Sequence, residues 1–267
     1  MTQSIPTRPV HSQANSPHSD IRPESARERL IVALDLRTPA ENADLVKRLG
    51  SKASFYKLGW GPLLRPGGPE LLARLLDEGK QLFLDLKFFD VPNTVHGAVT
   101  SVVGMNGVRF ITVHGDRAIV EAARAARGNS PLKILAVTAL TSLSERESRR
   151  LYSIPEDVTL EEHVVRVARN LVDSGFDGVI ASPWEVAAIR RSVPEQVVIA
   201  TPGIRLDGEP LDDQQRTGKP YDSVVAGADY LVVGRSVYRS SDPVGQVDRH
   251  VEEIERGLAG RRTPTPP

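Results

Sequence analysis

Three charged residues in one apolar stretch are the strongest candidates for chemistry. The run QLFLDLKFFDVPNT, residues 81–94, is among the most apolar in the chain, yet it contains Asp85, Lys87 and Asp90. Residues two apart in a strand point to the same face, so Asp85 and Lys87 are predicted to project together. Burying charges is costly unless they are paired, and a chain that retains them usually uses them. A structural ion pair that caps the strand is the alternative.

The charge pattern around Lys87 indicates which chemistry to expect. The two flanking carboxylates stabilise the charged form of Lys87. A protonated lysine donates a proton or stabilises a developing negative charge, and it is a poor amine nucleophile. A Schiff-base aldolase instead needs a lysine that is desolvated or lies beside other cations. The pattern therefore favours proton donation or electrostatic stabilisation over covalent catalysis.

The elements that must position these residues alternate along the chain. Eight short apolar runs are predicted strands: Leu30–Asp35, Ser54–Gly59, Gln81–Lys87, Val108–His114, Leu132–Thr138, Gly178–Ala181, Val197–Thr201 and Tyr230–Val233. Helical spacing of apolar residues predicts helices between and after them: Pro39–Leu49, Pro69–Glu78, Asn93–Val103, Arg117–Arg127, Leu160–Ser174, Glu185–Arg191, Tyr221–Ala226 and Val244–Leu258. The polar segment 143–156 is assigned to a rim loop with a short helix.

This alternation predicts an α/β fold with a parallel sheet. Continuous apolar strands suit a (β/α)8 barrel (a TIM barrel), whose strands are covered on both faces. An open doubly wound sheet, the competitor, usually carries a glycine-rich turn after its first strand, and residues 35–39 contain no glycine. The prediction is a single barrel domain over residues 29–258. Residues 1–28 are expected to form a disordered extension and residues 259–267 a flexible tail.

Composition narrows the partners and the compartment. Lys plus Arg and Asp plus Glu number 34 each, which gives no indication of nucleic acid or an anionic membrane as partner. Without cysteine, the chain can have no disulfide, thiolate nucleophile or cysteine-bound metal. No apolar run approaches the ~20 residues of a membrane span, and the N-terminus lacks a secretory h-region. A cytoplasmic protein is expected.

Polar residues recur at the carboxyl ends of the predicted strands, where barrels of this kind place their active sites. They are Asp35, Lys57, Asp85, Lys87, His114, Thr138 and Thr141. Asp35 and Thr38 can equally be helix N-caps, and His114 is expected to be a hydrogen-bonded core residue rather than a ligand. The convergence of several such residues on one rim is the informative feature.

The loops after the seventh and eighth strands are the usual phosphate site of such barrels. Gly234 lets the backbone approach an anion, and Arg235 can pair with phosphate oxygens. Gly203 and Arg205 supply a similar combination one strand earlier. These residues predict a phosphate site; turn glycines with solvated arginines are the alternative.

The segment D-x-K-x-x-D-V-P-N-T, residues 85–94, resembles the signature of the orotidine 5′-phosphate decarboxylase family. Further segments resemble that family in order: Leu34-Asp35, YKLG at 56–59, VTALTS at 137–142, TPGIR at 201–205, DDQ at 212–214 and VGR at 233–235. Two departures are Phe89 and Val91, where histidine and isoleucine are frequent; both leave the charged set intact. The resemblance covers nearly all of the predicted barrel but not the N-terminal extension.

The resemblance implies decarboxylation of orotidine 5′-phosphate to UMP, the last step of UMP synthesis, without cofactor or metal. The reaction would pass through a carbanion at C6 that Lys87 stabilises and protonates, with Asp85 near the departing carboxylate. The resemblance also implies a homodimer, in which Asp90 and Thr94 reach into the partner's site. The remaining roles that it implies are ribose binding by Asp35 and Lys57, pyrimidine contact by Thr141, and phosphate binding by Arg205, Gln214, Gly234 and Arg235.

Two other functions remain to be separated from this one. A related barrel decarboxylase of sugar phosphates shares the D-x-K-x-x-D element but uses Mg2+. The VPNT, DDQ and VTALTS segments argue against it. A non-catalytic nucleotide-binding barrel is the other alternative, and the complete charged set argues against that.

Overall fold

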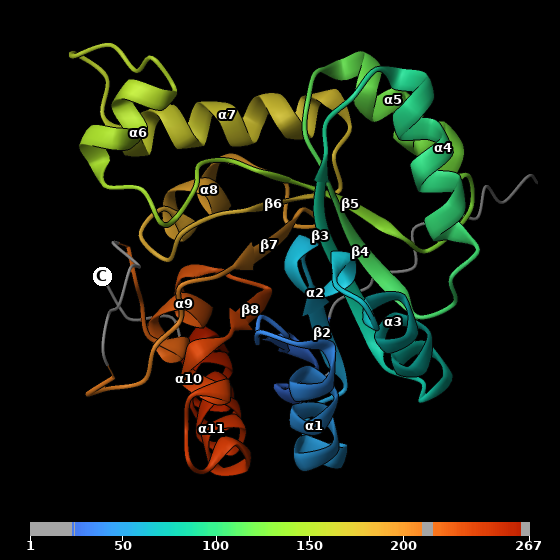
Figure 1. The fold of residues 1–267 in the computed structure, drawn as a ribbon. Helices are drawn as coiled ribbons and strands as arrows, with labels where there is room; N and C mark the ends of the chain where they lie inside the picture. The colour runs from blue at the N-terminus through green and yellow to red at the C-terminus, as the bar shows by residue number, and fades with distance from the viewer. Residues whose placement is uncertain (1–22, 24, 210–215, 263–267) are drawn as a thin grey trace, which may run out of the picture.

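The computed structural model describes Pro23 and residues 25–209 and 216–262. Within these residues the strands pair in chain order, all parallel, and the eighth pairs with the first to close a barrel (Figure 1). The strands are β1 (Leu30–Ala33), β2 (Phe55–Leu58), β3 (Gln81–Phe88), β4 (Val108–Val113), β5 (Lys133–Val137), β6 (Gly178–Ile180), β7 (Val198–Thr201) and β8 (Tyr230–Val233). The predicted (β/α)8 barrel is confirmed.

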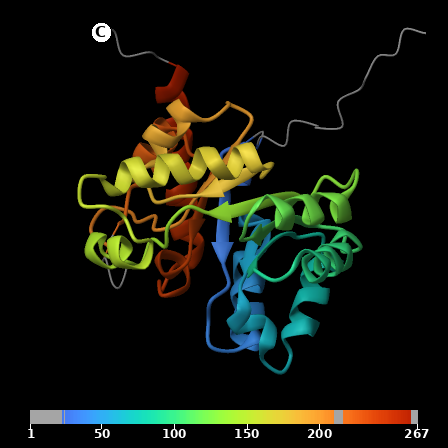
Figure 2. The ribbon, with the colours of Figure 1, turned by 90° about the horizontal axis from the view of Figure 1, so that it is seen from above.

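Helices lie on the outside of the strands (Figure 1), and Figure 2 shows α7, in yellow, and α5, in green, along one side of the barrel. They are α1 (Pro39–Leu49), α2 (Trp60–Leu64), α3 (Gly68–Asp77), α4 (Pro92–Val103), α5 (Arg117–Arg127), α6 (Glu145–Leu151), α7 (Leu160–Ser174), α8 (Val186–Ser192), α9 (Pro220–Ala226), α10 (Arg235–Tyr238) and α11 (Pro243–Arg262), with 3-10 turns η1 (Arg27–Arg29) and η2 (Gly50–Lys52). In the described ranges no helix is both long enough and apolar enough to cross a bilayer.

Three helices begin at the same local signal, a Ser or Thr followed three residues later by Glu. In α1 the Thr38 hydroxyl accepts the Glu41 amide, and the Glu41 side chain accepts the Thr38 amide in return. Ser144 and Thr159 start α6 and α7 in the same way. Such a capping box satisfies amide groups that the first helical turn leaves without partners. Thr38 is therefore a helix N-cap, one of the two interpretations that its sequence position allows.

The apolar core has two layers, which explains why the strands read as continuous apolar runs. One layer fills the barrel interior and includes Phe55, Phe83, Phe110 and Tyr230. Their rings are in contact, with centroids 4.8 Å apart for Phe110 and Tyr230. The other layer lies between strands and helices. The aromatic side chains of the first layer fill the interior of the barrel.

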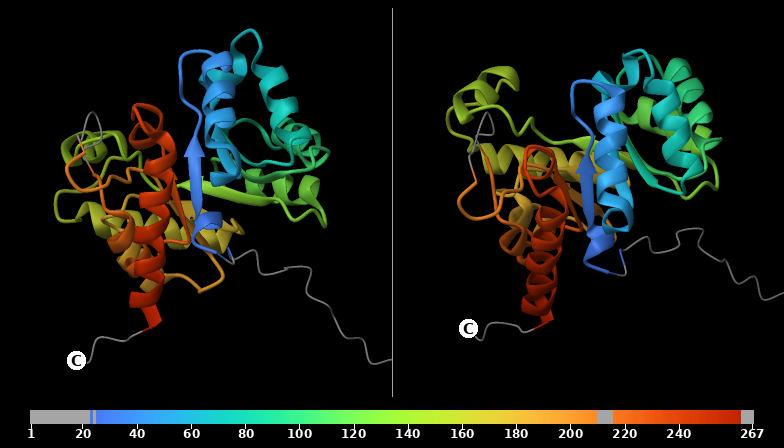
Figure 3. Two further views of the ribbon diagram at one scale, coloured as in Figure 1. Left: turned by 90° about the horizontal axis from the view of Figure 1, so that it is seen from below. Right: turned by 60° about the horizontal axis from the view of Figure 1, so that its bottom comes forward.

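The N-terminal part of the described chain packs against α11 beside the barrel. Helix α11 lies next to α1 (Figure 3), and Asp248 of α11 forms ion pairs with Arg27 and Lys52. Helix α11 continues to Arg262, four residues past the predicted boundary at 258, and Ala26 is buried in the core ahead of the boundary at 29. The predicted terminal segments otherwise remain predictions, because residues 1–22, 24 and 263–267 lie outside the described part.

Candidate active site

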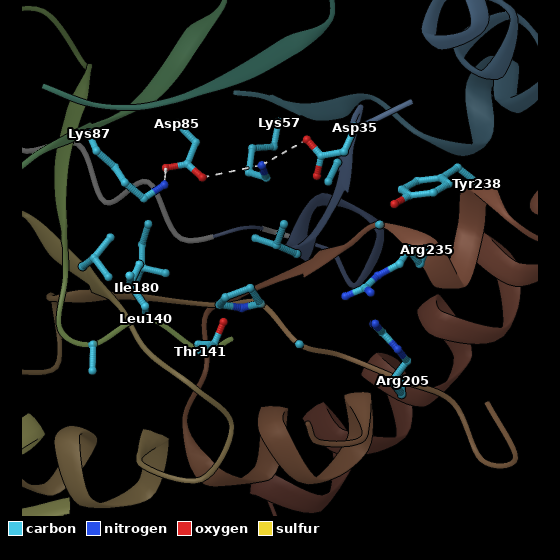
Figure 4. A pocket seen from close by; sticks show the side chains of 17 residues that line it. Asp35, Lys57, Asp85, Lys87, Leu140, Thr141, Ile180, Arg205, Arg235 and Tyr238 are labelled. Carbon is cyan, nitrogen blue, oxygen red and sulfur yellow. Dashed lines mark hydrogen bonds and ion pairs between the residues drawn. The ribbon is translucent and has the colours of Figure 1, made fainter. Parts of the chain in front are cut away.

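A pocket at the carboxyl-terminal mouth of the barrel brings together most of the predicted site residues (Figure 4). These residues come from the ends of six strands and the loops that follow them. They are Asp35, Lys57, Asp85, Lys87, Thr141, Arg205, Gly234 and Arg235. Apolar side chains, among them Leu140 and Ile180, line the wall below Lys87 in the figure.

Four of these side chains form a row of alternating charge. The Lys57 ammonium lies 3.6 Å from Asp35 and 3.5 Å from Asp85, and the Lys87 ammonium lies 2.7 Å from Asp85. Burial alone would raise the pKa of Asp85, but the two ammonium groups and hydrogen bonds from Lys87 and Thr112 outweigh it and lower that pKa. Asp85 is therefore a carboxylate at neutral pH, held between two cations.

The backbone at Lys87 departs from regular strand geometry. Its φ is 47°, in the left-handed region that residues with a side chain rarely adopt. The pairing of β3 with β4 shifts between Leu84 and Phe88, which marks a bulge around this residue. Backbone strain of this kind costs free energy and concentrates at functional sites. Here it accompanies a lysine that points into the pocket and contacts Asp85, as the two-residue spacing predicts.

Thr112 on β4 stabilises this arrangement and was not identified from the sequence. Its hydroxyl donates to the Asp85 carboxylate at 3.0 Å and accepts the Lys87 amide at 2.8 Å. The side chain is fully buried. One threonine thus fixes both members of the ion pair across the bulge. The sequence feature that could have identified Thr112 is its position as a polar residue within the apolar strand VRFITV, residues 108–113.

Two arginines occupy the opposite end of the pocket from Lys87. The guanidinium groups of Arg205, from the loop after β7, and Arg235, the first residue of α10, point toward each other (Figure 4). Guanidinium groups are well suited to bind the oxygens of a phosphate through several hydrogen bonds. Gly234 precedes Arg235, and a Cβ there would come within 3.4 Å of the Tyr238 ring. This end of the pocket suits a phosphate group.

Tyr238 also lines the pocket and was missed by sequence reasoning. Its ring lies between Asp35 and Arg235, with the hydroxyl directed into the cavity (Figure 4). Burial raises the pKa of the phenol, and the negative charge of Asp35 raises it further. The hydroxyl is therefore a neutral hydrogen-bond donor at physiological pH. A tyrosine at the end of a four-residue helix carries no periodic signal that would have marked it.

Three predicted site residues are not placed in this pocket. Asp90 and Thr94 are exposed outside it, and the Asp90 carboxylate accepts the amide of Val91 at 2.7 Å. The sequence predicted carboxylates on both sides of Lys87. In the described residues Asp85 forms an ion pair with Lys87, and no ion pair joins Asp90 to it. Gln214 lies outside the described residues.

The expectation for His114 was wrong. Strand β4 ends at Val113, one residue earlier than predicted, and His114 is exposed in the following loop. Its ring packs edge-on against Phe89, with centroids 5.6 Å apart. Across the described residues, no cluster of three or more His, Asp or Glu side chains is arranged to hold a metal ion.

A closed parallel barrel with a charged pocket at its carboxyl-terminal mouth defines the class of (β/α)8-barrel enzymes. Residues 28–250 match the sequence model described as the orotidine 5′-phosphate decarboxylase / HUMPS family. The chain belongs to this family, as the resemblance of its motifs predicted.

Curated relatives and solved structures agree with this assignment. The orotidine 5′-phosphate decarboxylase of Nitrobacter winogradskyi is 40% identical over 233 residues, which are 87% of this chain and 95% of that protein. The enzyme of that name from Ruegeria pomeroyi is 44% identical over 221 residues, 82% of this chain and 90% of the relative. The crystal structure of orotidine 5′-phosphate decarboxylase from Lactobacillus acidophilus superimposes with a TM-score of 0.71 at 31% identity, covering 84% of this chain and 98% of that one.

Proposed function

We propose that this chain is an orotidine 5′-phosphate decarboxylase, which converts its substrate to UMP and CO2 in pyrimidine biosynthesis. The observation that carries the proposal is the row Asp35–Lys57–Asp85–Lys87, which faces two arginines across one pocket. Named decarboxylases about 40% identical over most of the chain support it. We propose that the enzyme is cytoplasmic and that its substrate is a nucleoside monophosphate.

The charged row suits a decarboxylation through a carbanion. The bond from C6 to the carboxylate breaks with its electron pair left on C6, CO2 departs as a neutral molecule, and the Lys87 ammonium gives C6 a proton. Asp85 stands near the substrate carboxylate, and two like charges ~4 Å apart repel by about 4 kcal/mol at an effective dielectric near 20. That repulsion disappears with CO2, while Lys87 attracts the carbanion that remains. We assign more of the rate acceleration to stabilisation of the carbanion by Lys87 than to the repulsion between Asp85 and the substrate carboxylate.

The rest of the pocket binds the parts of the substrate that do not react. Asp35 and Lys57 hold the ribose, Thr141 contacts the pyrimidine, and the phosphate is held by Arg205, Gly234 and Arg235. Binding energy from a remote phosphate offsets the cost of orienting and desolvating the reacting ring. The separation of the arginines from Lys87 along the pocket supports this division of roles.

We further propose a homodimer that completes each site with Asp90 and Thr94 of the partner. Both residues lie exposed outside their own pocket, at the junction of β3 and α4. Phe89 and Val91, on either side of Asp90, are 70% and 61% exposed. Exposed apolar side chains grouped around a functional residue support an interface there.

A decarboxylation assay with a chelator tests the proposed function. The purified protein is incubated with orotidine 5′-phosphate, with and without excess EDTA, and the loss of substrate absorbance is followed. We expect the same conversion to UMP in both samples. Conversion that stops in EDTA would instead indicate a metal-dependent reaction, as in the related Mg2+-dependent decarboxylases, and binding of UMP without any conversion would indicate the non-catalytic barrel.

Replacing Arg235 with alanine should weaken phosphate binding. Hydrogen bonds from a charged donor contribute ~1.5–3 kcal/mol, so the KM for orotidine 5′-phosphate should rise roughly 10- to 100-fold. Calorimetry with UMP and with uridine localises the effect. UMP affinity should fall while uridine affinity stays the same, and an equal loss for both ligands would place Arg235 away from the phosphate.

Replacing Tyr238 with phenylalanine removes one hydroxyl and leaves the ring that packs at Gly234. A neutral hydrogen bond contributes ~0.5–1.5 kcal/mol, so the KM should rise about 3- to 10-fold with kcat nearly unchanged. Steady-state kinetics check this. An unchanged KM would show that the hydroxyl makes no contact with the substrate.

A further inference from the structure

A buried ion pair lies beside the pocket without lining it. Arg216 donates to the Glu185 carboxylate at 2.5 Å, and the two side chains are 3% and 5% exposed. Glu185 immediately precedes α8. The other terminal nitrogen of Arg216 donates to the backbone carbonyl of Leu140 at 2.9 Å, in the loop after β5. One guanidinium therefore joins the start of α8 to the loop that carries Thr141.

The backbone next to Arg216 is tied to the other wall of the pocket. The Arg205 amide donates to the Gly218 carbonyl at 2.9 Å, and the Gly218 amide donates to the Gly203 carbonyl at 3.2 Å. The Thr217 carbonyl accepts the Trp184 indole N–H at 2.9 Å. The segment 216–218 thus holds the loop of Arg205 through its backbone and the loop of Thr141 through one side chain.

Stability alone is a poor explanation for this pair. Glu185 Oε2 and Arg216 Nε are buried with no hydrogen-bond partner among the described residues. An ion pair that is buried and incompletely hydrogen-bonded is often no more stable than apolar side chains of similar volume. The pair does, however, join two loops that are far apart in the chain, the loop of Thr141 and the segment 216–218 that holds the loop of Arg205. The main effect of the pair is therefore to fix the relative position of these two loops.

We propose that Arg216 and Glu185 are positioning residues for decarboxylation. They set the distance between the Thr141 wall, which faces the pyrimidine, and the Arg205 wall, which faces the phosphate. A substrate anchored at its phosphate then presents C6 at the correct place for Lys87. This inference rests on the proposed function and adds to it a pair that does not touch the substrate.

Three variants separate positioning from stability. In Glu185→Leu/Arg216→Met both charges are replaced by apolar groups, so the melting temperature should stay near that of the wild type. In Arg216→Lys an ion pair with Glu185 remains possible, but one ammonium cannot reproduce the two contacts that the guanidinium makes with Glu185 and with the Leu140 carbonyl. Arg127→Met is the matched control, because Arg127 pairs with Asp177 at 2.6 Å with 8% and 12% exposure, ahead of β6 at the other end of the barrel.

The measurements are melting temperature, kcat and KM for orotidine 5′-phosphate. A misplacement of about 1 Å can cost 10²-fold, so kcat of the double variant and of Arg216→Lys should fall ~10- to 100-fold, with a smaller change in KM. Arg127→Met should lose melting temperature and keep kcat. Wild-type kcat in a folded Arg216→Lys or double variant would overturn the positioning role. Wild-type protein that does not convert the substrate would refute the proposed function itself.

Discussion

Lys87→Ala is expected to lower kcat by about 10⁴-fold, since a proton donor and an electrostatic stabiliser are lost together. The side chain should matter far less for binding, because the phosphate and ribose contacts lie elsewhere in the pocket. UMP should therefore still bind with an affinity close to that of the wild type. Steady-state decarboxylation and calorimetry with UMP measure the two effects separately.

Lys52→Ala provides the control for this variant. Lys52 also forms an ion pair at 2.7 Å, with Asp248, and is 44% exposed, against 40% for Lys87. It lies outside the pocket, so its loss should leave kcat unchanged. Near-normal turnover by Lys87→Ala would contradict the role assigned to Lys87.

A mixture of two inactive variants should recover activity if Asp90 serves the partner's site. Lys87→Ala and Asp90→Ala are each expected to be nearly inactive as pure proteins. After subunit exchange, half of the dimers are hybrids, and each hybrid contains one site with an intact Lys87 and an intact Asp90. Random exchange in a two-fold dimer therefore predicts about a quarter of the wild-type rate. The mixed sample is assayed before and after exchange.

The pair Lys87→Ala and Asp85→Asn gives the matching negative control. These two side chains are in contact within one pocket of one chain, at 2.7 Å. A hybrid of the two variants has no site with both residues intact, so mixing should recover nothing. Recovery in this control, or none with Asp90→Ala, would argue against a site shared between subunits.

Local signals in the sequence were sufficient for the barrel. Each strand is covered on both faces and so appears as an unbroken apolar run, and the three- and four-residue spacing of apolar side chains marked the longer helices. The prediction that Asp85 and Lys87 face the pocket together was correct, although it assumed a regular strand and the backbone at Lys87 departs from one. Helices α2 and α10 were missed because four or five residues are too few to show a helical period.

Contacts between distant segments could not be predicted in the same way. Thr112 reaches Asp85 across a bulge in the β3–β4 pairing, and Arg216 reaches Leu140 from 76 residues away. Neither residue belongs to a motif that its neighbours in sequence reveal. His114 was misplaced because a one-residue difference in strand length moved it from the core to a loop. The charged row was predictable, whereas the residues that hold it in place required the fold.

A crystal structure of the protein with bound UMP tests the central claim most directly. We expect the Lys87 ammonium within about 3.5 Å of C6, the contact distance at which a group can transfer a proton to it. The phosphate should lie between Arg205 and Arg235, at the other end of the pocket. A Lys87 ammonium directed into solvent while UMP occupies the pocket would contradict the account.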